Sequence, residues 1–119
     1  MPWLRVGAVL AALAVMAGAF GAHGLEDHVT PERLETWQTG ARYHLFHALA
    51  LCLLGALPSP PRVVGWLFVG GILLFAGSLY ALVLLDLGVL GAVTPLGGAA
   101  FIAGWITLAI QAPKALTRA

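Results

Sequence analysis

The 119-residue sequence has a single cysteine and few charged residues. One cysteine excludes an internal disulfide framework and a CxxC metal or redox motif. Charged residues make up 9% of the chain, against about 25% in an ordinary soluble protein. The net charge of +1 offers no basic surface to a nucleic acid, so nucleic-acid binding is not expected.

Apolar residues, in contrast, are abundant and make up 61% of the chain. A small soluble domain buries only about 60% of the surface that its unfolded chain exposes, so it could not hide this much apolar surface. The same hydrophobicity excludes disorder. The chain shows no linker and no internal repeat. We therefore predict one integral membrane domain over residues 1–119.

A helix that spans a membrane needs about 20 mostly apolar residues. Four stretches meet this need, at about 3–22, 37–57, 63–85 and 94–112. The second helix is expected to begin earlier, because Thr30 and Pro31 form an N-terminal capping pattern. A similar pair, Thr94 and Pro95, is expected to open the fourth helix, which should end before Pro113. The predicted fold is all-α, a bundle of four transmembrane helices with short loops.

The first stretch also has an alternative interpretation as a secretory signal peptide. Residues 1–5 resemble the basic start of such a peptide, and Ala17-Gly18-Ala19 resembles a cleavage site. Cleavage there would leave three spans. We favour a retained first helix and four spans.

The orientation in the membrane is predicted from the basic residues, which favour the cytoplasmic side. With four spans, both termini and the connection at 58–62 share one side. That side holds four of the six basic residues and no acid: Arg5, Arg62, Lys114 and Arg118. The other side holds Arg33, Arg42 and all five acids. Both termini are therefore predicted to be cytoplasmic.

Small residues recur at helical spacing in three of the stretches. Small side chains let membrane helices approach closely. The seams are Gly7, Ala11, Ala14, Gly18 and Gly21; Gly70, Gly77 and Ala81; and Gly97, Ala100 and Gly104. Each seam is consistent with packing inside one bundle or with an interface between copies. The expected partners are membrane lipids, further copies of the chain and a larger membrane complex.

The second stretch places its polar residues on one helical face. At 100° per residue, these residues fall within an arc of about 100°: Arg33, Thr36, Gly40, Tyr43, His44 and His47. With Trp37 at the membrane interface, His44 and His47 lie roughly 10 and 15 Å inside it. An ionisable group at that depth is costly and is a candidate functional residue.

The third stretch has polar residues at a matching depth. Ser78 and Tyr80 lie about 12 and 9 Å inside the outer boundary that Asp86 marks. These side chains and those of Tyr43, His44 and His47 are predicted to line one polar pocket that opens outward. The start of the fourth helix at Thr94 would add free backbone N–H groups at its rim.

Three interpretations of the His44/His47 pair stay open: hydrogen bonding between helices, a site for a ligand or a proton, and a metal or haem site. HExxH is absent, and no carboxylate lies at that depth to complete a zinc site, so no metal or cofactor is predicted. The sequence also lacks a nucleophile elbow, a P-loop and paired intramembrane carboxylates. We therefore do not expect an enzyme.

Several motifs resemble those of the YgdD-like family of small bacterial inner-membrane proteins, whose function is unknown. They cover nearly the whole chain: Gly18-Ala19-Phe20-Gly21-Ala22-His23-Gly24-Leu25, Trp37-Gln38-Thr39-Gly40, Tyr43 with Phe46-His47-Ala48-Leu49-Ala50, Gly77-Ser78-Leu79-Tyr80, Val93-Thr94-Pro95-Leu96-Gly97-Gly98 and Gly104-Trp105. The resemblance implies a four-helix protein of the bacterial cytoplasmic membrane without an established activity. It adds His23 to the candidate site residues.

Two functions follow as predictions. The first is a non-enzymatic binding, accessory or structural component of the membrane. The second is a small transport or ligand-binding unit that uses the predicted pocket, with His47 at its centre. The candidate ligand-binding residues are His23, Tyr43, His44, His47, Ser78, Tyr80 and Thr94.

Overall fold

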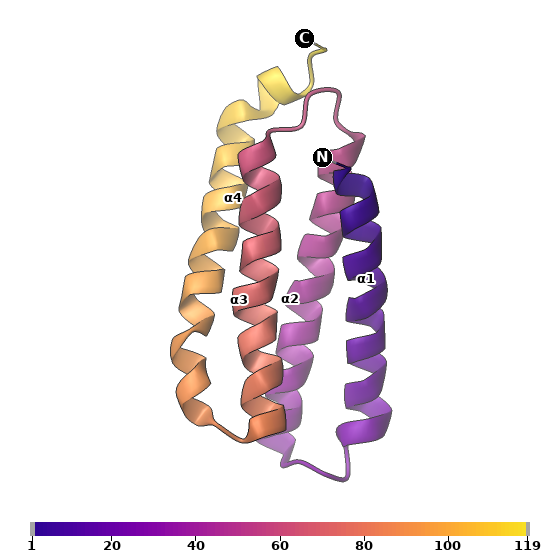
Figure 1. The fold of residues 1–119 in the computed structure, drawn as a ribbon, viewed down its shortest axis with the longest axis vertical. Helices are drawn as coiled ribbons and strands as arrows, with labels where there is room; N and C mark the ends of the chain where they lie inside the picture. Colours follow the sequence, from indigo (N-terminus) through magenta and orange to yellow (C-terminus); the bar gives the residue numbers. More distant parts are fainter. Residues whose placement is uncertain (1, 119) are drawn as a thin grey trace.

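The computed structural model describes residues 2–118, which form four long helices and contain no strand (Figure 1). The long helices are α1 (Trp3–Phe20), α2 (Pro31–Ala56), α3 (Arg62–Leu85) and α4 (Thr94–Ala115). A π-helical turn, η1 (Gly21–Leu25), extends α1, and a 3-10 helix, η2 (Gly88–Ala92), precedes α4. The all-α prediction is confirmed; the ends of the predicted domain, residues 1 and 119, lie outside the described residues.

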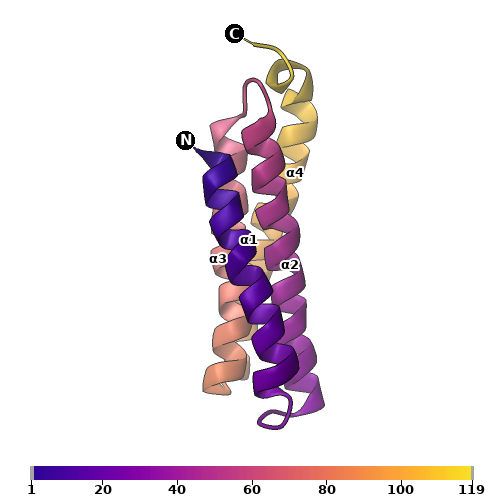
Figure 2. The ribbon, with the colours of Figure 1, turned by 90° about the vertical axis from the view of Figure 1, so that its right-hand side faces the viewer.

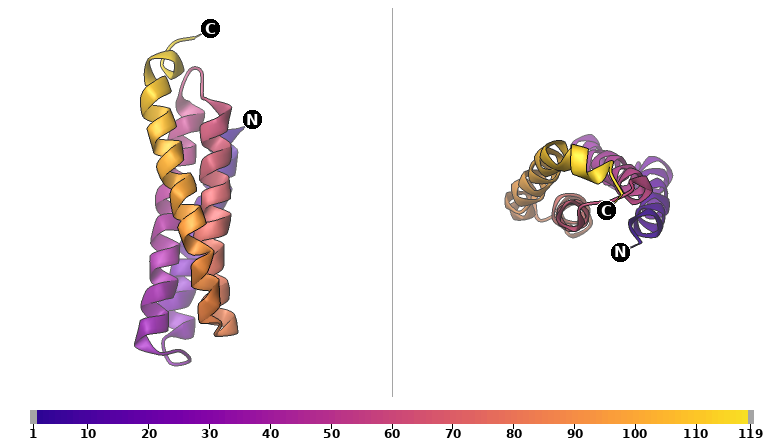
Figure 3. Two further views of the ribbon diagram at one scale, coloured as in Figure 1. Left: turned by 90° about the vertical axis from the view of Figure 1, so that its left-hand side faces the viewer. Right: turned by 90° about the horizontal axis from the view of Figure 1, so that it is seen from above.

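The helices form an open bundle in which each long helix packs mainly against its neighbours in the sequence. Seen from above, α1 and α4 occupy the two ends of a curved row, and α2 and α3 lie between them (Figure 3). The molecule measures 52 × 25 × 17 Å along its principal axes. Its shortest dimension is therefore about the thickness of two packed helices. Much of the apolar surface of α1 and α4 is therefore left uncovered by the chain itself.

The connections explain where α2 and α3 begin. The Thr30 hydroxyl accepts a hydrogen bond from the backbone N–H of Arg33 at 3.2 Å, and Pro31 occupies the first helical position. This confirms the predicted cap. The proline-rich segment after α2 is extended at Leu57 and Pro61, and α3 starts at Arg62.

Helix α4 begins at Thr94 as predicted, but its cap and its end differ from the prediction. Thr94 does not cap the helix, because η2 runs into α4 through Val93, which is itself helical. The Val93 carbonyl already accepts from Leu96 N–H at 3.0 Å, so the expected free N–H groups are partly used. The helix also continues through Pro113 to Ala115, where the Ala115 carbonyl accepts from Ser59 N–H at 3.0 Å.

Both termini and the α2–α3 connection lie at one end of the bundle, and the other two connections lie at the opposite end (Figures 1 and 2). This is the arrangement on which the orientation argument depends. Which end faces the cytoplasm stays a prediction.

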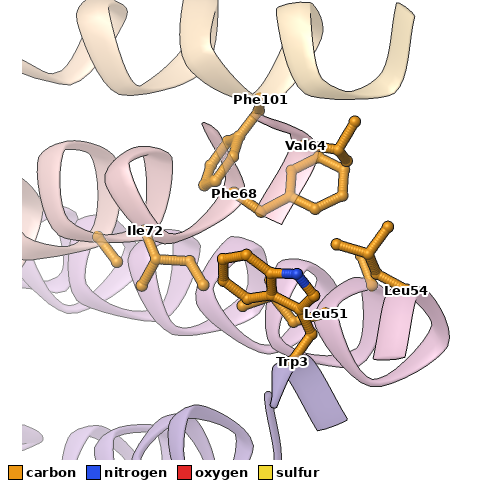
Figure 4. Close-up of a cluster of buried hydrophobic side chains, with 9 residues drawn as sticks. Trp3, Leu51, Leu54, Val64, Phe68, Ile72 and Phe101 are labelled. Atoms are coloured by element: carbon orange, nitrogen blue, oxygen red, sulfur yellow. The ribbon is translucent and has the colours of Figure 1, made fainter. Parts of the chain in front are cut away.

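The main core gathers buried hydrophobic side chains around Trp3, Leu51 and Phe68 (Figure 4). Its largest fully buried side chains are Trp3, Phe68, Leu51, Leu54 and Val64. Trp3 lies against Gly65, where any β-carbon would collide with the indole ring. The core therefore contains side chains from all four long helices and holds each helix to the next one in the sequence.

Most of the small-residue seams are used inside the chain. A β-carbon on Gly7 would lie 2.7 Å from backbone atoms of α2, and one on Gly104 would lie 2.6 Å from the Phe68 ring. The α3 seam differs, since a β-carbon on Gly70 or Gly77 would meet no atom within 4 Å. The α1 and α4 seams pack within the bundle, and the two α3 glycines face outward.

Three segments are long and apolar enough to cross a membrane: Trp3–Leu25, Arg62–Leu85 and Gly88–Ala115. The 26-residue helix α2 is not among them. The physical reason is its polar middle, where Arg42, His44 and His47 interrupt the apolar residues. That α2 is a fourth span stays a prediction.

Candidate functional site

Helix α2 carries the candidate site, because it lies between α1 and α3 and directs polar side chains to both sides. His44 and His47 are 6% and 5% exposed, respectively, although each has an ionisable ring. The two positions differ by three residues, so their side chains diverge by about 60° around the helix axis. That divergence sends the two rings to opposite sides of α3.

His47 joins α2 to α4. Its Nδ1 lies 2.8 Å from the backbone carbonyl of Tyr43, and its Nε2 accepts a hydrogen bond from Trp105 Nε1 at 3.0 Å. Because a carbonyl can only accept, Nδ1 must carry the hydrogen, and the ring is neutral. The ring also stacks on Phe101, with ring centroids 3.5 Å apart and planes 8° apart. His47 is therefore fully engaged by its neighbours.

His44 faces the other side of α3. Its Nδ1 lies 2.9 Å from the Tyr80 hydroxyl. The Tyr80 ring is held by Trp37, at a centroid distance of 4.6 Å, and passes Gly40, where a β-carbon would lie 3.2 Å from it. The His44 Nε2 atom is buried and has no hydrogen-bond partner.

Ser78 and Thr94 form a link between α3 and the start of α4. The Ser78 hydroxyl donates to the Phe75 carbonyl at 2.9 Å, so the Thr94 hydroxyl is the donor in the 2.6 Å bond between the two side chains. This bond holds the beginning of α4 against α3.

The sequence did not indicate that Trp37 and Gln38 would bind the end of α1. Trp37 Nε1 donates to the Ala17 carbonyl at 2.7 Å, and Gln38 Nε2 donates to the Gly18 carbonyl at 3.2 Å. These acceptors lie just before η1, where the change from α- to π-helical bonding alters the backbone pairing. Trp37 is 5% exposed and lies inside the bundle.

The seven candidate residues do not line one pocket. Tyr43 and His47 line a groove between α2 and α4, of about 510 Å³, with Phe75, Phe101 and Trp105. His44 and Tyr80 line a smaller groove between α1 and α3, of about 170 Å³. His23 is exposed in η1. The predicted shared cavity is wrong, because α3 separates the two histidines; ligand binding by these residues stays a prediction.

The aromatic wall of the α2–α4 groove was missed by the sequence reasoning. Phe101 and Trp105 are four residues apart on α4, so they lie on one face and meet His47 together. Two signals in the sequence pointed to these residues, this spacing and the Gly104-Trp105 motif, but neither revealed their partner.

A third hollow lies outside the helical core, where the loops meet. Arg33 and Asp86 pair there at 3.2 Å, and His28 is among the residues around them. Within residues 2–118, no group of three or more His, Cys, Asp or Glu side chains is placed to hold a metal ion.

Comparison with known proteins shows the family to which the chain belongs. Residues 17–98 match the family described as "Protein of unknown function (DUF423)". The chain belongs to this family. The matched segment includes η1, the two histidines, Ser78 and Thr94, and it ends before Phe101 and Trp105.

The relatives are membrane proteins without a stated activity. The chain is 46% identical to the "UPF0382 membrane protein YwdK" of Bacillus subtilis (strain 168), over 96% of this chain and 98% of the relative. It is 44% identical to the "UPF0382 membrane protein SAB0533" of Staphylococcus aureus (strain bovine RF122 / ET3-1), over 94% of this chain and 95% of the relative. No solved structure matches.

Membership in the DUF423 family shows a membrane protein of unknown function, for which no catalytic activity is indicated. The YgdD-like name and the motifs assigned to it stay predictions.

Proposed function

We propose that the protein is a non-enzymatic accessory component of the bacterial cytoplasmic membrane. In this proposal α2 is a fourth span and both termini are cytoplasmic. The protein would contact lipids, further copies of itself and a larger membrane complex through the uncovered sides of its helical row.

The observation that supports this proposal is the state of His47. Both of its ring nitrogens are hydrogen-bonded, and one ring face is covered by Phe101. A general base needs a free lone pair within reach of a substrate. The His47 lone pair is instead occupied by Trp105, as expected of a residue that holds helices together.

The test separates stability from binding. The His47→Ala variant is purified from membranes in a mild detergent, and its melting temperature and co-purifying proteins are compared with those of the parent. The proposal expects the variant to melt at a lower temperature than the parent. Below that temperature, the variant should co-purify with the same proteins as the parent. A variant that melts like the parent but loses transport of a solute in reconstituted vesicles would instead support a transporter.

The α2–α4 groove favours a second candidate, a small ligand-binding or transport unit. The groove has a volume of about 510 Å³, and five of its lining residues carry aromatic or imidazole rings: Tyr43, His47, Phe75, Phe101 and Trp105. Tyr43 is 42% exposed, so its hydroxyl is accessible from the side of the bundle. Such a groove suits an apolar molecule that carries a flat ring.

A groove-filling variant tests this candidate. Ile102 is exposed at the groove and supplies no hydrogen bond to the candidate residues. Ile102→Trp should displace a small molecule that native mass spectrometry detects on the parent protein, while Ile110→Trp, on the exposed surface of the same helix, should retain it. Equal retention by both variants would exclude the groove as the binding site.

A further inference from the structure

We propose that Thr39 and Tyr43 form the polar end of the α2–α4 groove, and that their hydroxyls donate hydrogen bonds to the carbonyl oxygen of a flat ring, as in a lipid-soluble quinone. The proposal rests on the second candidate function, in which this groove binds a ligand. It moves the polar contact with the ligand away from His47, which the sequence predicted at the centre of the site.

The hydroxyls and the indole of the groove lie at different levels of the bundle. Helices α2 and α4 both begin at the end opposite to the termini, so they run in the same direction (Figure 1). Trp105 of α4 bonds to His47 of α2 and marks one level. Thr39 and Gly98 line the groove about 12 and 10 Å earlier along their helices. A ligand therefore meets hydroxyls at one end of the groove and closely packed rings at the other.

Tyr43 supplies an unused hydrogen-bond donor. The side chain is 42% exposed and lines the groove. Its ring is positioned by Phe75, with ring centroids 4.9 Å apart. Within residues 2–118, the side chain of His47 bonds to the backbone carbonyl of Tyr43, and the Tyr43 hydroxyl has no partner. This hydroxyl is free to donate to a ligand atom.

Thr39 supplies a second donor, which a neighbouring cation strengthens. Arg42 Nη2 donates to the Thr39 hydroxyl oxygen at 3.2 Å and to the Glu35 carboxylate at 2.8 Å. The Thr36 hydroxyl donates back to the Glu32 carbonyl at 3.0 Å, but in the described part of the chain the Thr39 hydroxyl has no such acceptor. Linked hydrogen bonds polarise one another, so the bond from Arg42 makes the Thr39 hydroxyl a stronger donor.

The two donors favour a neutral carbonyl oxygen as their partner. Thr39 and Tyr43 are four residues apart and lie on one face of α2, so both hydroxyls lie toward the same part of the ligand. A carboxylate is disfavoured, because Glu35 already pairs with Arg42 and the groove would have to desolvate a second charge. A carbonyl accepts both hydrogen bonds without bringing a charge into the groove.

The remaining walls favour a flat ring with an apolar tail. Phe75, Phe101 and Trp105 line the groove beside the hydroxyls, and Ile102 is 62% exposed at its side. Aromatic walls pack well against a flat ring. His47 adds a further ring face but no free polar atom, because both of its nitrogens are bonded. A quinone combines the flat ring, the carbonyl oxygens and the hydrocarbon tail that these walls accept.

The experiment measures the binding of two probes to the purified full chain in dodecyl maltoside by isothermal titration calorimetry. Decyl-benzoquinone carries the carbonyl oxygens, and decylbenzene has the same tail and a flat ring without them. Thr39→Val and Tyr43→Phe each remove one hydroxyl. Thr107→Val is the matched control, because its hydroxyl donates to the Ala103 carbonyl at 2.7 Å and lies outside the groove.

The quinone should bind the parent, and each hydroxyl variant should bind it about fivefold more weakly, as expected for the loss of one hydrogen bond. Thr107→Val should bind it like the parent. Neither Thr39→Val nor Tyr43→Phe should change the binding of decylbenzene. Melting temperatures close to that of the parent confirm that the variants are folded.

A groove-filling variant separates this proposal from the candidate function on which it rests. A β-carbon on Gly98 would meet only Phe75, at 4.0 Å, so Gly98→Leu places its side chain in open space along the groove. Gly70 is equally open but lies on α3 outside the groove, so Gly70→Leu is its control.

Two results would overturn the proposal. If the hydroxyl variants bind the quinone like the parent but Gly98→Leu binds it more weakly, the groove binds a ligand but the donors are assigned wrongly. If the parent does not bind the quinone, or if Gly98→Leu binds it as well as the parent and Gly70→Leu do, the groove is not a quinone site.

Discussion

Replacement of His47 by alanine should destabilise the protein by about 2–3 kcal/mol, as summed from three contributions. Two hydrogen bonds are lost, one to the Tyr43 carbonyl and one from Trp105, at about 0.6 kcal/mol each inside a membrane. The stacked contact with Phe101 adds about 0.5–1.5 kcal/mol, and the cavity that remains accounts for the rest.

The assay is reversible unfolding of the purified protein in mixed micelles, followed by tryptophan fluorescence. His47→Phe divides the effect, because it keeps a ring on Phe101 and loses both hydrogen bonds; it should cost about 1 kcal/mol. Leu49→Ala, at an exposed position of the same helix, is the control and should have little effect. If His47→Ala were as stable as the parent, the structural role assigned to this ring would be wrong.

Further substitutions test the other contacts. Trp105→Phe removes the indole donor and should cost about 1 kcal/mol, but nothing further when combined with the alanine variant in a double-mutant cycle. Trp37→Phe removes the indole donor from the Ala17 carbonyl, which keeps its bond from Gly21 N–H, and should accelerate amide hydrogen exchange in η1 but not in α4; uniform exchange would contradict this. Gly97→Leu should prevent folding, because its β-carbon collides with the Phe75 backbone. Gly70→Leu should fold normally, and equal yields of the two leucine variants in membranes would refute that difference.

The helices could be predicted well because their signals are local. Apolar length alone located α1, α3 and α4, and the Thr30–Pro31 pair located the start of α2. The start of α4 at Thr94 was predicted correctly, but the capping role of Thr94 was not, for a reason that is not local. Thr94 resembles a cap in sequence, but η2 already supplies the preceding turn, and the Thr94 hydroxyl bonds to Ser78 instead.

The site was predicted only in part, because helical spacing gives the face of a side chain but not the helix that covers it. His44 and His47 were correctly placed on the inward side of α2, and both are buried. The spacing did not show that α3 would lie between them. Whether a polar ring at such a position is fully bonded, as in His47, or half-bonded, as in His44, depends on the aromatic partners that the neighbouring helices supply.

The hydrogen on the His47 ring tests the central claim most directly, which is that this imidazole joins α2 to α4 and is not a free reactive group. Solid-state NMR of the nitrogen-15-labelled protein in lipid bilayers resolves both ring nitrogens. The structure predicts a protonated Nδ1 and an unprotonated Nε2 that correlates with the indole hydrogen of Trp105. A protonated Nε2, or no correlation with that indole, would contradict the account.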